Sequence, residues 1–186
     1  MKRQFFSIGM TALNTRRQRP RNGPSDDLTD LGYDLTYQFL GTREHTMSLA
    51  YVNIYERRKY GSPLVSSDPS MGPLDRGSVR DQTLSMNYAF KQTYGVLAAH
   101  MINTGSFDAA RYSPVGIPDT TSNLILVYWS PFGREGTYTT NANLRVSAGW
   151  FRFDKFNGST SNVFRGPPIT NPRDLDSFSL SVNLAF

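Results

Sequence analysis

A period-2 alternation of apolar and polar residues dominates the chain. The last segment, 177–186, is the clearest case: every second residue is large and apolar, and Ser, Asn or Ala stands between. Successive side chains of a strand point to opposite faces, so this segment predicts a strand with one apolar and one polar face. No stretch of ten or more residues carries a helical apolar stripe free of such alternation.

The alternation recurs often enough to predict a fold. Eight segments carry it: 5–13, 31–40, 46–55, 83–90, 94–103, 122–129, 141–150 and 177–186. The connections alternate between long (14–30, 56–81, 104–121, 154–176) and shorter (41–44, 91–93, 130–140). Bacterial outer-membrane barrels show this asymmetry between their two ends. The sequence therefore predicts a single all-β domain over 1–186, an antiparallel transmembrane β-barrel of which about eight strands are present.

Composition narrows the chemistry. Only 38% of the residues are hydrophobic, and 13% are aromatic. The longest strictly apolar run, 124–129, is far shorter than the roughly 20 residues of a membrane helix. The chain has no Cys, which excludes disulfides, thiolate metal sites, c-type haem attachment and a Cys nucleophile.

The net charge of +5 comes with local basic clusters. One cluster is Arg16, Arg17, Arg19 and Arg21, and the other is Arg57, Arg58 and Lys59. Both fall in predicted loops, where solvation or contact with lipid headgroups is the expected role. No nucleic-acid recognition module accompanies them, so nucleic acid is not an expected partner.

Two sets of residues follow from the predicted faces. The polar faces predict a lumen lining of Asp34, Gln38, Asn87, Asn143, Arg145, Ser147 and Asn183. In a wide barrel this lining tunes solute passage, whereas in a narrow one it forms a hydrogen-bonded plug. Aromatic residues predict the girdles at the two membrane interfaces: Tyr33, Tyr37, Tyr51, Tyr88, Tyr128, Trp129 and Trp150.

The final segment resembles the C-terminal assembly signal of bacterial outer-membrane barrels, which alternates apolar residues and ends in an aromatic. The matching residues are Phe178, Leu180, Val182, Leu184 and Phe186. This resemblance implies that the barrel-assembly machinery of a Gram-negative cell envelope is a partner.

Four further segments carry a resemblance that covers most of the chain. They are 30–41 (DLGYDLTYQFLG), 93–106 (TYGVLAAHMINTGS), 118–128 (PDTTSNLILVY) and 154–158 (DKFNG). They resemble the C-terminal half of a family of porin-like proteobacterial outer-membrane proteins, some of them associated with multihaem cytochromes. Tyr94, Gly95, Thr104, Gly105, Lys155, Phe156, Asn157 and Gly158 match the family pattern. His100, Met101 and the stretch 164–166 depart from it.

The resemblance implies an outer-membrane location and a passive, porin-like role. The barrel would pass solutes or sheathe a periplasmic electron-transfer partner such as a multihaem cytochrome, with outer-membrane lipid around it. It implies no bound cofactor, because the chain has no Cys-x-x-Cys-His motif. Full-length relatives begin with a signal peptide, and Ser7, Gly9 and Thr11 interrupt the only apolar stretch near Met1. We therefore expect Met1 to lie inside a longer parent protein, and the eight strands to form the C-terminal part of a larger barrel.

Three alternatives remain open at this point. The first is a closed eight-stranded barrel with a structural or adhesive role and no conduction. The second is a soluble β-sandwich or lipocalin-like binder, with apolar residues inside. The third is a barrel enzyme acting on lipid through His100. We expect no enzyme, because the chain lacks a G-x-S-x-G motif and has only His45 and His100 as histidines, too few for a convergent metal site.

The assembly signal generates a test. Replacing the terminal aromatic, Phe186→Ser, is expected to reduce outer-membrane insertion severalfold, because the signal loses its last apolar position. The amount of urea-resistant protein in isolated outer membranes measures this. Ala185→Ser, on the opposite face of the same strand, is the matched control, and equal membrane yields for the two variants would refute the signal.

Overall fold

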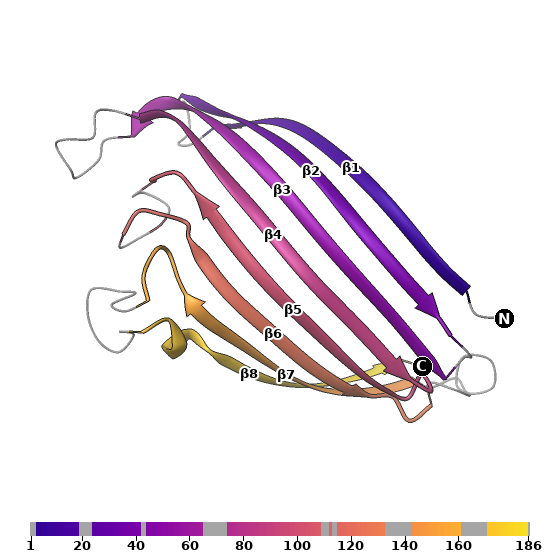
Figure 1. Cartoon of the computed structure of the whole chain (residues 1–186). Coiled ribbons are helices and arrows are strands. Elements are labelled where there is room, and N and C mark those ends of the chain that lie inside the picture. Colours follow the sequence, from indigo (N-terminus) through magenta and orange to yellow (C-terminus); the bar gives the residue numbers. More distant parts are fainter. Residues whose placement is uncertain are drawn as a thin grey trace.

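The chain folds into one antiparallel sheet. The computed structural model describes residues 3–18, 24–41, 44–64, 74–108, 112, 115–132, 143–160 and 171–185. Within them lie eight strands, each paired with the next in sequence, and one short 3-10 helix, η1 (Pro172–Leu175). The strands are β1 (Arg3–Gln18), β2 (Ser25–Leu40), β3 (His45–Leu64), β4 (Leu74–Phe90), β5 (Tyr94–Gly105), β6 (Thr120–Trp129), β7 (Asn143–Lys155) and β8 (Ser177–Ala185). The predicted all-β antiparallel class with eight strands is confirmed (Figure 1).

The sheet is curved and open. In Figure 1 it bends like a trough, with β1 at one edge and β8 at the other. β1 pairs with β2 alone and β8 with β7 alone among the described strands, so the sheet does not close on itself. An open trough of this kind is compatible with a fragment of a barrel wall.

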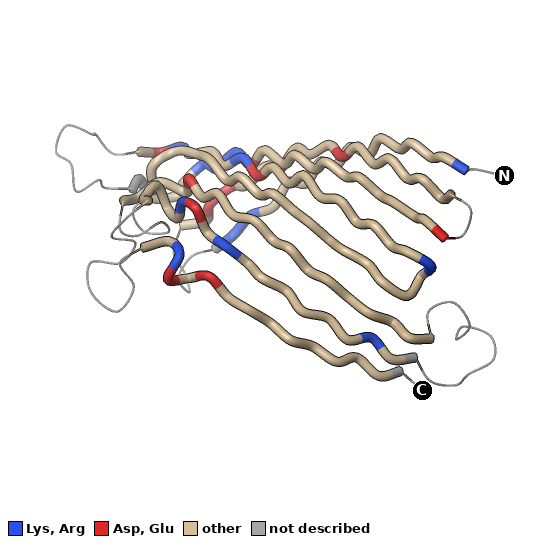
Figure 2. Tube along the Cα trace, turned by 60° about the horizontal axis from the view of Figure 1, so that its bottom comes forward, with Lys and Arg blue, Asp and Glu red and all other residues tan. Residues whose placement is uncertain are grey.

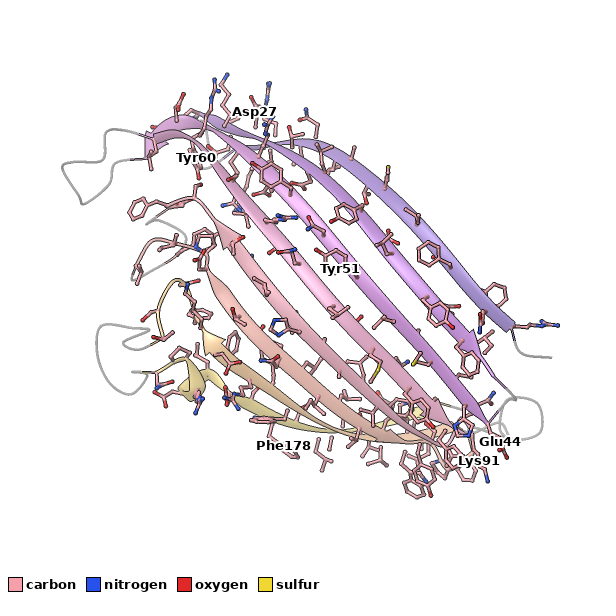
Figure 3. The ribbon with its side chains drawn as sticks, viewed as in Figure 1. Asp27, Glu44, Tyr51, Tyr60, Lys91 and Phe178 are labelled. Carbon is pink, nitrogen blue, oxygen red and sulfur yellow. The ribbon has the colours of Figure 1, made fainter. Side chains whose placement is uncertain are left out.

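Register assigns each side chain to one of two faces. Residues paired across an antiparallel ladder share a face, and so does every second residue along one strand. Following the pairs from β2 to β8 in this way places Asp27 and Phe178 on the same face. Figure 3 shows Asp27 and Phe178 pointing away from each other, outward from the bend. The face that they share is therefore the convex face, and the alternate residues lie on the concave face.

Strands β1–β7 continue past the segments that the alternation predicts, mainly toward one end. β3 continues to Leu64, although the predicted strand ends at 55. We call this the loop end; it carries the connections 19–24, 65–73, 106–119 and 156–176. We call the opposite end the hairpin end; it carries the connections 41–44, 91–93 and 130–142. The apolar alternation stops before the strands do, so it underestimates their length.

This difference corrects the predicted loops. Arg16 and Arg17 lie in β1, and Arg57, Arg58 and Lys59 lie in β3, whereas the sequence places all of them in loops. Arg19 and Arg21 fall outside the described residues. Charged pairs cross the ladder in these extensions, and Arg16 Nε lies 2.9 Å from Asp27 Oδ1 between β1 and β2.

The turn between β4 and β5 has two residues with unfavourable backbone angles. Lys91 (φ 51°) and Gln92 (φ 56°) both have positive φ, and Thr93 N donates to Phe90 O at 3.0 Å. This is the pattern of a type I′ hairpin turn, whose twist matches that of the strands and which normally carries Gly or Asn. The tight hairpin fixes the register of β4 against β5.

Gln92→Gly is expected to stabilise the fold, because glycine adopts positive φ without the cost of a Cβ. The expected gain is about 1 kcal/mol in the free energy of unfolding. Urea titration of the refolded protein in lipid or detergent measures it. Ser85→Gly, within β4, is the control and should lose stability; a gain in both variants, or in neither, would contradict the turn assignment.

Candidate functional site

An apolar row crosses all eight strands on the convex face. The ladders place eight residues in one register: Phe6, Tyr37, Leu49, Met86, Ala98, Ile125, Trp150 and Phe178. Their side chains are exposed at both edges, with Phe6 at 65% and Phe178 at 72%. Further apolar residues above and below this row widen it into a band, which we call the apolar band.

The apolar band runs obliquely to the strands. On β1 it extends from Phe6 to Ala12 toward the loop end, whereas on β8 it extends from Phe178 to Leu184 toward the hairpin end. Phe6 and Phe178 share one register row. The band lies on the loop-end side of this row on β1 and on its hairpin-end side on β8, so it shifts by the length of strand that it covers. A shift of about 6 residues over seven strand spacings corresponds to a strand tilt of roughly 30° against the band, near the tilt of barrel strands.

Aromatic and polar side chains meet at the borders of this band. At the hairpin end His45 Nδ1 lies 2.7 Å from Tyr88 Oη, and the rings of His45 and Phe90 have centroids 5.1 Å apart. At the other border Gln82 Nε2 donates to Tyr51 Oη at 2.6 Å. Among the residues predicted for girdles, six lie on the convex face: Tyr33, Tyr37, Tyr51, Tyr88, Trp129 and Trp150.

The prediction is wrong for Tyr128. Tyr128 precedes Trp129 in β6, so the two side chains point to opposite faces, and Tyr128 pairs with Gly95 on the concave face. Its ring covers Gly95, where any Cβ would collide with it. The Arg145 guanidinium lies 4.6 Å from the centre of the Tyr128 ring. Tyr128 therefore belongs to a concave cluster and not to a girdle.

The residues predicted to line a lumen gather on the concave face. Strand parity and register place six of them there: Asp34, Gln38, Asn87, Arg145, Ser147 and Asn183. Asn143 pairs with Ala185 at the hairpin end of β7. Neighbours on this face also bond to one another, as between the hydroxyl oxygens of Ser147 and Ser181 at 2.6 Å.

The concave face is not polar throughout. On β5–β7 its central positions are apolar, and they include Leu97 and Leu126, which share one register row with Asn87. Phe151 and Phe153, on the same face of β7, have ring centroids 4.8 Å apart. The polar lining thus covers β1–β4 and the hairpin-end part of β7 and β8, while an apolar patch covers the central part of β5–β7.

A buried arginine ties the connection 106–119 to the concave face at the loop end. The Arg58 side chain is 9% exposed; it pairs with Glu56, and its Nη1 lies 3.9 Å from Asp108 Oδ2. Tyr60 Oη donates to the same Asp108 oxygen at 3.2 Å. Burial opposes the charge, but hydrogen bonds to Glu56 and Tyr112 hold the pKa of Arg58 above its ordinary value. No local sequence pattern indicates this anchor, because Arg58 and Asp108 lie far apart along the chain.

Two carboxylates of the concave face are destabilised in their charged form. Burial, followed by repulsion from Glu56, raises the pKa of Asp30, and one of its carboxylate oxygens is buried without a hydrogen-bond partner. Burial likewise raises the pKa of Asp81, although Asn103 donates to it. Both residues lie just beyond the apolar band, near Arg58.

The C-terminal strand presents its predicted assembly residues together. Phe178, Leu180, Val182 and Leu184 all lie on the convex face, each more than 60% exposed. Phe186 lies outside the described residues. Figure 3 shows Phe178 at the outer edge of the sheet, where β8 has no neighbour beyond it among the described strands.

His100 belongs to a hydrogen-bonded chain on the convex face. Its Nδ1 donates to Asn123 Oδ1 at 2.8 Å, Asn123 Nδ2 donates to Asp154 Oδ2 at 2.7 Å, and Arg152 Nε pairs with Asp154 Oδ1 at 3.0 Å. This chain borders an open apolar hollow of about 650 Å³ whose floor includes Ala98. The Asn123 amide and the Arg152–Asp154 ion pair orient the imidazole of His100. Among the described residues, no hydroxyl group takes part in this series of hydrogen bonds.

Comparison with known proteins gave no relative. No family model matches the chain, and neither the curated proteins nor the solved structures contain a match. The family resemblance therefore stays a prediction. Among the described residues, no group of three or more His, Asp or Glu is arranged to hold a metal ion. In that same part of the chain, no helix has the length and apolarity needed to cross a membrane.

Asp30 generates a pH-dependent prediction. A raised pKa means that the stability contributed by Asp30 is complete below the ordinary value of 3.8 and is lost as the pH rises through the raised value. Asp30→Asn is therefore expected to stabilise the protein at pH 7 and to have no such advantage below pH 3.8.

Urea unfolding of variant and parent at pH 7 and pH 3.5 measures this difference. Asp75→Asn is the matched control, since that side chain is 72% exposed and surface changes rarely exceed about 0.5 kcal/mol. An Asp30→Asn variant less stable than its parent at pH 7 would show that the carboxylate is favourably paired.

Proposed function

We propose that this chain forms wall strands of a transmembrane β-barrel in a bacterial outer membrane. The barrel serves as a passive, porin-like conduit. In this proposal the convex face contacts lipid, the concave face lines the interior, and no residue performs catalysis.

The apolar row across all eight strands is the observation that carries the proposal. A soluble barrel or sandwich buries its apolar face inside and exposes its polar face. Here the arrangement is the reverse, since Phe6 and Phe178 are exposed on the convex face while Asp34 and Asn87 lie on the concave face. Membrane barrels have this inside-out pattern, together with a comparable strand tilt.

The two ends of the sheet support an orientation. The hairpin end has two short connections, 41–44 and 91–93, beside the longer 130–142. The loop end has the strand extensions and the two longest connections, 106–119 and 156–176. Figure 2 shows most charged residues gathered toward the loop end and the middle of the strands nearly free of them. Outer-membrane barrels place long loops outside the cell and short turns in the periplasm, so we orient the loop end outward.

The proposed activity follows from the concave face. Its polar residues on β1–β4 would contact water and polar solutes, and the described residues around Asp108, which Arg58 anchors, would narrow the outer entrance. A sheath around a periplasmic electron-transfer partner, such as a multihaem cytochrome, is the other form of this role. The exposed apolar face of β8 would bind the barrel-assembly machinery during insertion.

A closed, non-conducting eight-stranded barrel is the second candidate. One observation favours it: Leu126, Phe151 and Phe153 make the concave face of β5–β7 apolar, as in a narrow barrel whose interior is filled by side chains. In that form the loop end would carry structural or adhesive contacts.

Two neighbouring positions on β4 test the proposal, because the chain has no Cys of its own. Met86→Cys lies on the convex face and Asn87→Cys on the concave face, so they form a matched pair at one depth. In intact outer membranes, a charged, membrane-impermeant thiol reagent should label Asn87→Cys, and a lipid-soluble maleimide should label Met86→Cys.

The outcomes separate the candidates. Labelling of Asn87→Cys at more than ten times the rate of Met86→Cys by the charged reagent would support a water-filled interior. Protection of both positions from that reagent would support the closed, filled barrel. Rapid labelling of Met86→Cys by the charged reagent would refute the membrane-facing assignment altogether.

A further inference from the structure

A cationic groove lies on the convex face immediately beyond the apolar band. It has a volume of about 610 Å³, and its walls come from β2, β3 and β4 at the loop end. The convex residues of these strands that line it are Asp27, Thr29, Tyr55, Arg57, Lys59, Arg76 and Ser78. We call it the rim groove.

The rim groove carries a strong excess of positive charge. Arg57, Lys59 and Arg76 line it, and the one acidic residue in its wall, Asp27, is engaged by Arg16. Asp27 pairs with Lys59 in the β2–β3 ladder, but neither Lys59 nor Arg57 forms an ion pair among the described residues. All three basic side chains are exposed. Arg76 has only a distant, solvent-exposed contact with Asp75, at 3.9 Å. The basic groups are thus available to an anion.

The distance from the band matches a lipid headgroup. On β2 the band ends at Leu31, which pairs with Tyr55 on β3, and Arg57 and Lys59 follow Tyr55 on the same face. They therefore lie about 7 and 13 Å beyond that border along the strand. Leu31 and Tyr33, on the adjoining strand β2, continue the apolar surface below the groove. A ligand with a phosphate group and acyl chains could place its phosphate against the basic residues of the groove and its acyl chains against this apolar surface.

We propose that the rim groove binds the phosphate of a phosphorylated glycolipid of the outer leaflet, and that it does so from the outside of the barrel. Arginine binds phosphate oxygens through two parallel N–H donors, and lysine adds a compact charge. The hydroxyls of Thr29 and Ser78 supply further donors in the same groove. The inference rests on the proposed membrane orientation, which places the loop end in the outer leaflet.

The other border of the band lacks this chemistry. There Lys91 Nζ lies 3.9 Å from Glu44 Oε1 and 5.2 Å from the centre of the Phe90 ring, so its charge is partly neutralised. Figure 2 shows the basic residues of β1–β4 concentrated at the loop end. The asymmetry between the borders corresponds to a membrane whose outer leaflet is richer in phosphate esters.

The test uses the full chain inserted in vesicles that contain bisphosphorylated lipid A. The triple variant Arg57→Gln, Lys59→Gln, Arg76→Gln removes the charge of the groove. The matched control, Arg3→Gln, Lys91→Gln, Arg173→Gln, removes the same charge from exposed positions elsewhere. Resistance to urea extraction reports insertion, and native mass spectrometry after transfer to a phosphate-free detergent reports the lipid A bound per chain.

We expect the parent and the control to retain lipid A, and the groove variant to lose roughly 100-fold in affinity, since each basic side chain near an anionic surface contributes about fivefold. If all three proteins insert normally and retain equal amounts of lipid A, the proposed lipid site at the rim groove is overturned, while the proposed function is not. Failure of the parent to insert would overturn the proposed function and the groove with it. Displacement of lipid A by millimolar inorganic phosphate would show a free-phosphate site and overturn the lipid assignment.

Discussion

Antiparallel register is the constraint on which this structure depends. The ladders from β1 to β8 place one residue of every strand in the row that runs from Phe6 to Phe178, and all eight are apolar. A slip of one residue in any ladder would turn the next strand over and place its polar residues among the apolar ones. The tight turn at Lys91 and Gln92 and the close fit of Tyr128 on Gly95 each oppose such a slip, at some cost in backbone energy or in packing freedom.

The same constraint separates two environments along each strand. Between the borders of the apolar band the convex side chains are apolar, and beyond it toward the loop end they become charged, as at Arg57 and Lys59 on β3. The ladder continues through this change because backbone hydrogen bonds do not depend on side-chain polarity. Cross-strand pairs such as Arg16 with Asp27 contribute little on an exposed surface. The extensions therefore stay in register mainly because the apolar part of each strand fixes it.

This division explains which features the sequence predicts. Period-2 alternation identifies all eight strands and the faces of residues such as Asp34 and Trp150, because the alternation reports a boundary between apolar and polar surroundings. It fails where that boundary ends, so β3 was predicted to stop at 55 although it reaches Leu64. Aromatic character alone also misplaces Tyr128. It suggests a girdle at the membrane interface, but Tyr128 points to the face opposite that of its neighbour Trp129. The Arg58–Asp108 anchor joins distant segments, and no local pattern records it.

The unpaired edges of β1 and β8 link the fold to the proposed function. In hydrocarbon every backbone N–H and C=O must find a partner, so an open edge is not tolerated there. Direct pairing of β1 with β8 would bend the trough into a narrow barrel, and the apolar patch at Leu126 and Phe151 would then fill its centre. Pairing with further strands would keep the present gentle curvature, leave Asn87 and Arg145 facing water and make conduction physically reasonable. The partner of the β8 edge therefore determines whether the concave face is a core or a channel wall.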